Sequence, residues 1–386
     1  MKKYRIGELG EIFTGNTPSK KNNEFYESED IMFIKPDILS SNITIIKQAN
    51  EYLSEKAREK ARIIPKGSLL VSCIGNIGKL GINIEEVAFN QQINAIVHNS
   101  KISSSKYLAY LLKYNQKKLE SIANAPVVPI INKSQFSDFE LSIHEELEIQ
   151  SKIVEILDKA QELIDKRKEQ IKTLDELVKS QFIEMFGDPV TNSKGWKKKK
   201  LNELGELSRG KSKHRPRNAP ELLGGPYPLV QTGDIANAGI YLKEYTQTYS
   251  ELGLKQSKMW DKGTLCITIA ANIAKTSILT FDACFPDSVV AFIPNDKTNN
   301  MFIQFWMSFL QKILEDSAPE SAQKNINLKI LSEQNVIVPP IELQNQFADF
   351  VKQVDKLKFE MEKSLKELED NFNALMQKAF NGELFN

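Results

Sequence analysis

Two long segments of the chain carry apolar side chains in alternating steps of four and three residues. The first stripe consists of Ile153, Leu157, Ala160, Ile164, Arg167, Ile171, Leu174 and Val178, and the second of Phe347, Val351, Val354, Lys358, Met361, Leu365, Leu368, Phe372, Leu375 and Ala379. A 4-3 rhythm kept over several heptads is typical of coiled coils, and neither helix can bury its stripe alone. The pattern predicts two long helices that pack on each other, with Arg167 and Lys358 as charged intrusions that fix the register.

The first helix carries further signals beside its stripe. We expect it to end at Gly187, because a glycine followed within two residues by Pro189 stops a helix. A second apolar row, formed by Ile149, Ile156, Leu163 and Leu177, lies off the stripe. This row predicts another surface to bury, either against a partner protein or against the globular parts of this chain.

The rest of the chain is duplicated. The tetrapeptide ELGE occurs at residues 8–11 and again at residues 203–206, 195 positions later. At nearly the same offset, residues 63–79 (IIPKGSLLVSCIGNIGK) match residues 259–275 (MWDKGTLCITIAANIAK), and residues 33–38 match residues 229–235 as short strands closed by Asp-Ile. Turn residues separate these β-rich stretches, and residues 103–122 have the serine start and apolar spacing of a helix.

These patterns predict an α+β protein with two tandem mixed α/β domains. The expected domains are residues 1–145 and 188–340, each followed by a helical segment, residues 146–187 and 341–386. If a pseudo-twofold axis relates the two copies, the paired helices run antiparallel and the globular domains lie at opposite ends of the pair. Parallel helices would place both domains at one end.

Composition changes this picture little. The 386 residues are 41% hydrophobic and 26% charged with a formal net charge of +1, and no apolar run approaches the ~18 residues of a membrane span. Cys73, Cys266 and Cys284 lie in apolar runs without CxxC spacing, which predicts buried reduced thiols and a cytoplasmic protein. Basic residues cluster at 197–200 and 209–217, and a neutral chain binds a polyanion when such residues share one face.

Several segments together resemble the specificity subunit of type I restriction–modification enzymes. They are FGDPVTNSKGWKKKKLNELGEL (residues 186–207), ELGEIFTGNTPSK (8–20), the helix starts ELEIQ and IELQ, and the closing AFNGELF. The resemblance covers essentially the whole chain and implies a non-catalytic subunit that reads a bipartite sequence in double-stranded DNA, one half per recognition domain. It also implies that the helices set the gap between the half-sites and hold two methyltransferase subunits, with restriction subunits joining the full complex.

The residues themselves show no sign of catalysis. We find no methyltransferase motif and no Walker A sequence, and His98, His144 and His214 have no partner at metal-ligand spacing. We therefore expect no catalytic residue, metal or cofactor in this chain, and the resemblance implies that S-adenosylmethionine, ATP and magnesium bind the partner subunits. A non-enzymatic paired-helix scaffold that binds proteins is the alternative, and it would lack the steep salt dependence of phosphate contacts.

Three pairs of matched loops are candidates for DNA contact, in which phosphate contacts position the protein and base contacts specify the sequence. The first pair contains Thr14, Asn16, Thr17, Ser19, Lys20 and Lys21 in one copy, and Arg209, Lys211, Lys213, His214, Arg215 and Arg217 in the other. The second pair offers Asn76 and Asn272 for adenine, with Lys79 and Lys275 for phosphate.

The third pair differs between the copies, as base readers of unlike half-sites would: Gln91 and Gln92 face Asp287 and Ser288. Each pair also has an alternative interpretation. The first could be solvated loops, the second a tight turn with its asparagine in a left-handed conformation, and the third a loop that has drifted in sequence.

Overall fold

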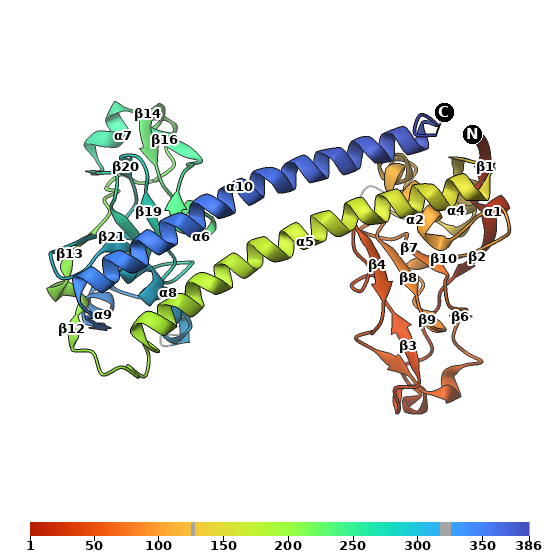
Figure 1. Cartoon of the computed structure of the whole chain (residues 1–386), viewed down its shortest axis with the longest axis horizontal. Helices are drawn as coiled ribbons and strands as arrows, with labels where there is room; N and C mark the ends of the chain where they lie inside the picture. The colour runs from red at the N-terminus through yellow and green to blue at the C-terminus, as the bar shows by residue number, and fades with distance from the viewer. Residues whose placement is uncertain (125–127, 317–325, 386) are drawn as a thin grey trace. The chain divides into compact units, whose positions relative to one another are not determined.

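The chain forms two compact units, in a computed structural model that describes all residues except 125–127, 317–325 and 386. Unit 1 comprises Met1–Lys168 with Lys363–Asn386, and unit 2 comprises Glu169–Glu362. Each unit holds one globular domain and a part of each long helix, α5 (Leu147–Phe186) and α10 (Ile341–Phe380) (Figure 1). The four-part division expected from the sequence stays a prediction.

The described residues of unit 1 form three small sheets. The largest has the strand order β2 (Gly10–Thr14), β10 (Ile93–His98), β7 (Leu69–Ser72), β8 (Leu80–Asn83) and β4 (Ile43–Ile46). A four-stranded sheet has the order β5 (Tyr52–Leu53), β3 (Ile31–Ile34), β9 (Val87–Phe89) and β6 (Ile63–Ile64), and β1 (Lys2–Arg5) pairs with β11 (Glu140–Ile143). The run that contains β7 is a strand, and β7 is buried along its whole length. The reading of residues 33–38 as a strand was wrong beyond Ile34, because Lys35 to Ile38 form a turn in which the N–H of Ile38 donates to the Lys35 carbonyl at 3.1 Å.

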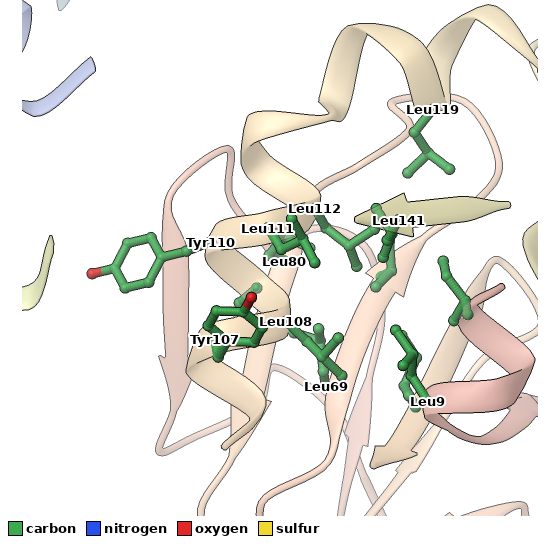
Figure 2. Packing of buried hydrophobic residues seen from close by; sticks show 14 of the residues in the cluster. Leu9, Leu69, Leu80, Tyr107, Leu108, Tyr110, Leu111, Leu112, Leu119 and Leu141 are labelled. Carbon is green, nitrogen blue, oxygen red and sulfur yellow. The ribbon is translucent and has the colours of Figure 1, made fainter. Parts of the chain in front are cut away.

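The core of unit 1 lies between the five-stranded sheet and its helices. These are α1 (Ile6–Leu9), α2 (Ser105–Tyr114), α3 (Gln116–Ser121) and α4 (Lys133–Asp138), with short 3-10 turns η1 (Asn23–Tyr26) and η2 (Glu55–Ala57) elsewhere. Figure 2 shows Leu108, Leu111 and Leu112 of α2 turned toward the strands, while Tyr110 points away from them. The tyrosine hydroxyl donates instead to Asp158 Oδ1 of α5, at 2.7 Å.

The helix expected over residues 103–122 is two helices. Ser104 caps α2 as expected, because its hydroxyl accepts from the N–H of Tyr107 at 3.4 Å. The helix is interrupted at Asn115, whose side-chain Nδ2 donates to the carbonyl of Leu111 at 2.9 Å. An asparagine that bonds a nearby backbone carbonyl competes with the helical ladder, which explains the break.

Unit 2 repeats the topology of unit 1. Its five-stranded sheet has the order β13 (Gly205–Arg209), β21 (Val289–Pro294), β18 (Leu265–Thr268), β19 (Thr276–Leu279) and β15 (Tyr241–Leu242). Its four-stranded sheet has the order β16 (Gln247–Tyr249), β14 (Leu223–Leu229), β20 (Ala283–Cys284) and β17 (Met259–Trp260), and β12 (Lys198–Lys200) pairs with β22 (Asn335–Ile337). The duplication seen in the sequence is thus a duplication of the fold.

The helices of unit 2 include one that lies where the sequence predicted a strand. They are α6 (Thr232–Asn237), α7 (Glu251–Lys255), α8 (Asn300–Asp316) and α9 (Leu328–Ser332), with the 3-10 turns η3 (Leu201–Glu203) and η4 (Pro220–Leu222). The reading of residues 229–235 as a strand was wrong beyond Leu229, because a helix begins at Thr232. Its first turn is fixed by the carboxylate of Asp234, which accepts from the N–H of Gln231 at 2.8 Å.

The two long helices run antiparallel within each unit. In unit 1, the imidazole Nε2 of His144, just before α5, lies 2.8 Å from the carbonyl of Ala379, and Lys168 pairs with Glu369 at 2.8 Å. In unit 2, Lys358 pairs with Asp175 at 2.7 Å, and Phe182 packs edge-on against Phe347. The predicted class, two mixed α/β domains with a pair of long helices, is confirmed.

Most of the predicted stripe is buried inside its own unit. The stripe positions exposed by less than a tenth are Ile153, Leu157, Ile164, Leu174, Val178, Phe347, Val351, Val354, Phe372 and Ala379. Ile171, Met361, Leu365 and Leu368 are half-buried. In unit 2 aromatic rings join the two helices: Phe182 and Phe186 of α5 contact Phe347 of α10, with ring centroids 5.3 and 5.5 Å apart.

Candidate nucleic-acid interface

In unit 1, strand pairing brings the three candidate loops to one end of the five-stranded sheet. The strand β2 ends at Thr14, opposite Asn94 near the start of β10, and β7 ends at Ser72, opposite Ile93. The loop after β2, the turn after β7 and the turn before β10 therefore leave the sheet at the same end. Backbone hydrogen bonds join them, from Gly15 N to the Ile93 carbonyl at 3.2 Å and from Cys73 N to the Gln92 carbonyl at 2.8 Å.

Unit 2 holds the corresponding loops in the same way. Arg209, the last residue of β13, lies opposite Val290, and Thr268, the last residue of β18, lies opposite Val289. The joining hydrogen bonds are also equivalent, from Gly210 N to the Val289 carbonyl at 2.8 Å and from Ile269 N to the Ser288 carbonyl at 3.0 Å. Two copies of one loop constellation thus occur in the chain.

A glycine is required where the first loop leaves the sheet. A Cβ atom placed on Gly15 would lie 2.2 Å from the Asn90 carbonyl oxygen, and one on Gly210 would lie 2.3 Å from the Phe285 and Pro286 carbonyl oxygens. No side chain fits at that distance, so the turn before β10 crosses directly over the start of the first loop. This contact explains why both duplicated openings end on a glycine.

Side chains of the first loop in unit 1 form hydrogen bonds within the domain. Thr14 donates from its hydroxyl to Asn94 Oδ1 at 2.6 Å, and the Asn16 amide bridges the Lys60 carbonyl and the Arg62 N–H, both at 2.6 Å. The Thr17 hydroxyl donates to Gln91 Oε1 at 2.8 Å. Asn16 therefore has a clear structural role, whereas Ser19, Lys20 and Lys21 are exposed.

The bridge made by Asn16 adds basic residues that sequence reasoning missed. Lys60 and Arg62 are exposed and lie beside the first loop, since Asn16 bonds the backbone of both. The signal was the segment KAREKAR at residues 56–62, which has four basic residues and lies between two short strands. Its distance of more than forty positions from Asn16 hid the contact.

The second pair of loops consists of tight turns with exposed asparagines. Asn76 and Asn272 are exposed, and Lys79 and Lys275 are half-buried. The left-handed residues of the turns flank the asparagines: they are Gly75 and Gly78 in unit 1, and Ala271 and Ala274 in unit 2, with φ from +58° to +81°. The alternative of a left-handed asparagine was therefore wrong. The left-handed backbone conformation falls on the residues beside Asn76 and Asn272 and not on the asparagines themselves.

In unit 2, three arginines of the basic loop contact Asp287, which lies in the turn before β21. The Asp287 carboxylate contacts Arg217 Nη2 at 2.5 Å and Arg215 Nη2 at 3.6 Å, and its backbone carbonyl accepts from Arg209 Nε at 3.0 Å. Lys211 and Lys213 are exposed, and His214 is half-buried with its Nδ1 3.2 Å from the Pro216 carbonyl.

The basic loop is also held from a neighbouring segment. Gln256, which follows α7, accepts with Oε1 from the N–H of Lys213 at 2.6 Å and from the N–H of His214 at 3.1 Å. Sequence reasoning missed both Gln256 and the pairing role of Asp287, because neither residue is adjacent in sequence to the basic run.

In the third pair of loops, Gln91 is exposed and Gln92 is half-buried. Gln92 Oε1 accepts from Asn90 Nδ2 at 2.9 Å, and Gln92 N donates to Asn90 Oδ1 at 3.1 Å. Gln92 is thus bound within its turn, while Gln91 reaches across to Thr17 of the first loop. Gln91 and Asp287 hold the same place in the two copies and contact the first loop in both.

The lysine run and the cysteines lie in strands or in the buried core. The lysine run at residues 197–200 largely forms β12, and the described part of the chain contains no cluster of three His, Cys, Asp or Glu side chains able to hold a metal. The three cysteines are buried and unpaired, and burial raises the pKa of Cys73 to about 12. No helix among the described residues is long and apolar enough to cross a membrane.

The geometry defines a class of protein: a tandem repeat in which two α/β domains each present polar and basic loops at a sheet end, joined by a pair of long helices. Comparison identifies the family. The chain belongs to the type I restriction modification DNA specificity domain family, whose pattern matches residues 1–174 and 193–370. It is a DNA sequence-recognition subunit of this type, as its two matched domains and its fold indicate.

Relatives and solved structures agree with this assignment. The chain is 25% identical over 407 aligned positions to the type I restriction enzyme MjaIX specificity subunit of Methanocaldococcus jannaschii, covering 98% of this chain and 92% of that protein. It is 35% identical over 161 positions to the HindI specificity subunit of Haemophilus influenzae, covering 39% and 34%.

The fold resembles that of the type I restriction–modification S subunit from M. genitalium, with a TM-score of 0.58, 15% identity and coverage of 98% and 96%. A chain from a type I system described for its assembly and conformational transition gives a TM-score of 0.64, 19% identity and coverage of 99% and 98%. These two likenesses concern the fold.

Proposed function

We propose that this chain gives a type I restriction–modification complex its sequence specificity by reading a bipartite target in double-stranded DNA. Each recognition domain contacts one half-site, and the long helices set the gap between the half-sites and hold two methyltransferase subunits. Restriction subunits join the full complex. The chain itself performs no catalysis and binds no cofactor, and it works in the cytoplasm.

The observation that carries this proposal is the repeated loop constellation at one end of each five-stranded sheet. Both constellations combine exposed amides, which can pair with base edges, and exposed basic side chains, which can pair with phosphates. The backbone bonds that hold the loops are the same in the two units, whereas the side chains differ. A duplicated frame with unlike side chains suits the reading of two different half-sites.

A second feature supports the binding of two copies of one partner. Leu163 of α5 and Leu357 of α10 occupy the same position in the two repeats, and they are exposed by 53% and 47%. Leu163 belongs to the second apolar row predicted on the first helix, and Ile156 of that row is matched by Phe350. Equivalent apolar positions in both units suit two identical methyltransferase subunits, each bound to one unit.

The proposal is tested by reconstituting the chain with its methyltransferase and mapping the methylated positions. We expect methylation at one split sequence. Changing Asn272 to Ala should relax the sequence preference in one half-site only, because an amide that reads a base specifies a single position. Changing Lys211 and Lys213 to Ala should weaken binding to all sequences about equally and reduce the salt slope, because phosphate contacts carry no sequence information.

Lys297 is the matched control, since it is exposed and follows the opposite end of β21 from the loops. Its change to Ala should leave both the preference and the affinity unchanged. Methylation without sequence preference would refute the proposal, and binding to duplex DNA that does not weaken with salt would favour the protein-binding scaffold instead.

A further inference from the structure

The basic loop of unit 2 is partly neutralised by a residue from a different loop. Asp287 lies in the turn between β20 and β21, and its side chain is 35% exposed. It meets Arg217 at 2.5 Å through Oδ1 and Arg215 at 3.6 Å through Oδ2, so each carboxylate oxygen faces one guanidinium. The two arginine side chains are themselves 45% and 56% exposed, so they lie at the surface where a ligand can reach them.

A carboxylate and a phosphate compete for the same arginine donors. The planar guanidinium presents its N–H groups in a fork that fits two oxygens of either group. Arg215 also donates from Nη1 to the carbonyls of Ser212 and His214, at 2.6 and 2.8 Å, which leaves Nη2 as the atom directed at Asp287. A DNA phosphate that bound Arg215 Nη2 and Arg217 Nη2 would have to replace Asp287.

We propose that Asp287 competes with the DNA backbone for Arg215 and Arg217. Its carboxylate occupies the two arginines until a DNA phosphate displaces it. This inference rests on the proposed function and names one residue that sets how strongly the second recognition domain holds DNA through phosphates. Asp287 acts through the two arginines and is therefore a positioning residue. The charge it removes from the loop weakens binding to any duplex, and most of all binding that depends on phosphates alone.

The first recognition domain shows the arrangement without the competing charge. Gln91 holds the position of Asp287 in that copy, and its neutral amide accepts a hydrogen bond from Thr17 at 2.8 Å. The contact between the turn and the first loop is thus kept in both units, while the carboxylate is present in one. Gln91 and Asp287 therefore separate two roles. A neutral side chain is enough to hold the first loop in place, whereas neutralising the basic loop needs a charge.

The test compares the full chain with three variants. Wild type, D287N, D287E and D296N are titrated against a fluorescent duplex of unrelated sequence, and anisotropy is followed between about 50 and 200 mM KCl. D287N keeps the size and hydrogen-bonding groups of the side chain and removes the charge, and D287E keeps the charge. Asp296 is exposed and follows the opposite end of β21, so D296N removes the same charge away from the loop.

We expect D287N to bind about threefold to thirtyfold more tightly than wild type, the range given by two partly exposed ion pairs of ordinary strength. The slope of log affinity against log salt should steepen by about one, because in wild type the displaced Asp287 carboxylate takes up a cation and offsets one cation released from the DNA. D287E and D296N should match wild type. If D287N does not fold, D287S removes the same charge with a smaller side chain and should give the same gain.

Unchanged or weaker binding by D287N, with wild type binding normally, would overturn the inference and leave the proposed function intact. If D287N binds more weakly than wild type while D287E binds as wild type does, Asp287 holds the two arginines in place for DNA and does not compete with it. If neither wild type nor D287N shows salt-dependent binding to duplex DNA, alone or with the methyltransferase, the proposed function itself fails.

Discussion

A buried glutamine at the start of each long helix joins that helix to its recognition domain. In unit 2, Gln344 is fully buried and uses both ends of its amide. Its Nε2 donates to the carbonyls of Pro339 and Lys297 at 2.9 and 3.1 Å, and its Oε1 accepts from the Thr298 hydroxyl and the Asn299 N–H at 2.9 and 3.2 Å. Gln150 also uses both ends of its amide in unit 1, with three hydrogen bonds, which gives a physical reason for the paired ELEIQ and IELQ segments.

Changing Gln344 to Leu keeps the side-chain volume and removes all four hydrogen bonds. Each buried polar group left without a partner destabilises a fold by about 1 to 3 kcal/mol. Pro339 and Thr298 are buried and stay unpaired, whereas the groups of Lys297 and Asn299 lie nearer the surface and can turn to water. We therefore expect unit 2 to lose about 2 to 6 kcal/mol of unfolding free energy, from two fully affected groups.

The positions of the tryptophans make this loss measurable in one unit. All three tryptophans of the chain, Trp196, Trp260 and Trp306, belong to unit 2, so tryptophan fluorescence follows its unfolding. With a urea dependence of about 2 kcal/mol/M, the fluorescence midpoint of Q344L should fall by about 1 to 3 M. Far-UV circular dichroism of the same samples reports both units.

The matched variant is Q150L, which breaks the equivalent bonds in unit 1. It should lower the circular dichroism transition and leave the tryptophan transition nearer to wild type than Q344L does. A fluorescence midpoint in Q344L within about 0.3 M of wild type would refute the hydrogen-bond reasoning, because the lost groups would then have found other partners. Equal fluorescence shifts in Q150L and Q344L would show instead that the two units unfold together.

Three further predictions concern other parts of the chain. The raised pKa of Cys73 means that its thiol stays protonated in the fold, so iodoacetamide at about pH 8 should alkylate it only after denaturation. The contribution of the protonated thiol to the free energy of unfolding should be lost as pH rises from 9 toward 12. Ala271 has φ +64° where unit 1 has Gly75, so A271G should raise the urea midpoint of unit 2 by the equivalent of about 1 kcal/mol, while A270G, outside the left-handed region, should not. Inserting one heptad in each long helix adds about 10 Å, so the preferred gap between half-sites should grow by about three base pairs, and an unchanged gap would contradict the role proposed for the helices.

The helix pair could be predicted from the sequence because its signal is long and periodic. A stripe that repeats every 3.5 residues leaves few other structures open, and the burial of Ile153 and Phe347 follows from it. Short elements gave weaker signals. The break at Asn115 and the helix begun at Thr232 each depend on one side-chain hydrogen bond to the backbone, which no periodic pattern records.

The sequence predicted which loops form the candidate site, but it did not predict the contacts that these loops make. The loops follow strands whose order in the sheet was unknown, so their meeting at one end became visible only through the pairing of β2, β10 and β7. Asn16 was expected to face DNA, yet its side chain accepts from the backbone N–H of Arg62, and the basic loop of unit 2 faces Asp287. Both partners are more than forty positions away, beyond the reach of any local pattern.

The duplication separates what the frame needs from what each domain reads. Residues that hold the loops have equal roles in the two units: Gly15 and Gly210 admit the crossing turn, and Gln150 and Gln344 fasten the helices. Had the loops served only the fold, their tips would be expected to keep the same chemistry under the same constraints. They differ at the place where Gln91 in one unit corresponds to Asp287 in the other, although the backbone bonds around them are equivalent. Divergence at the tip of a preserved support favours the proposal that each recognition domain reads a half-site of its own.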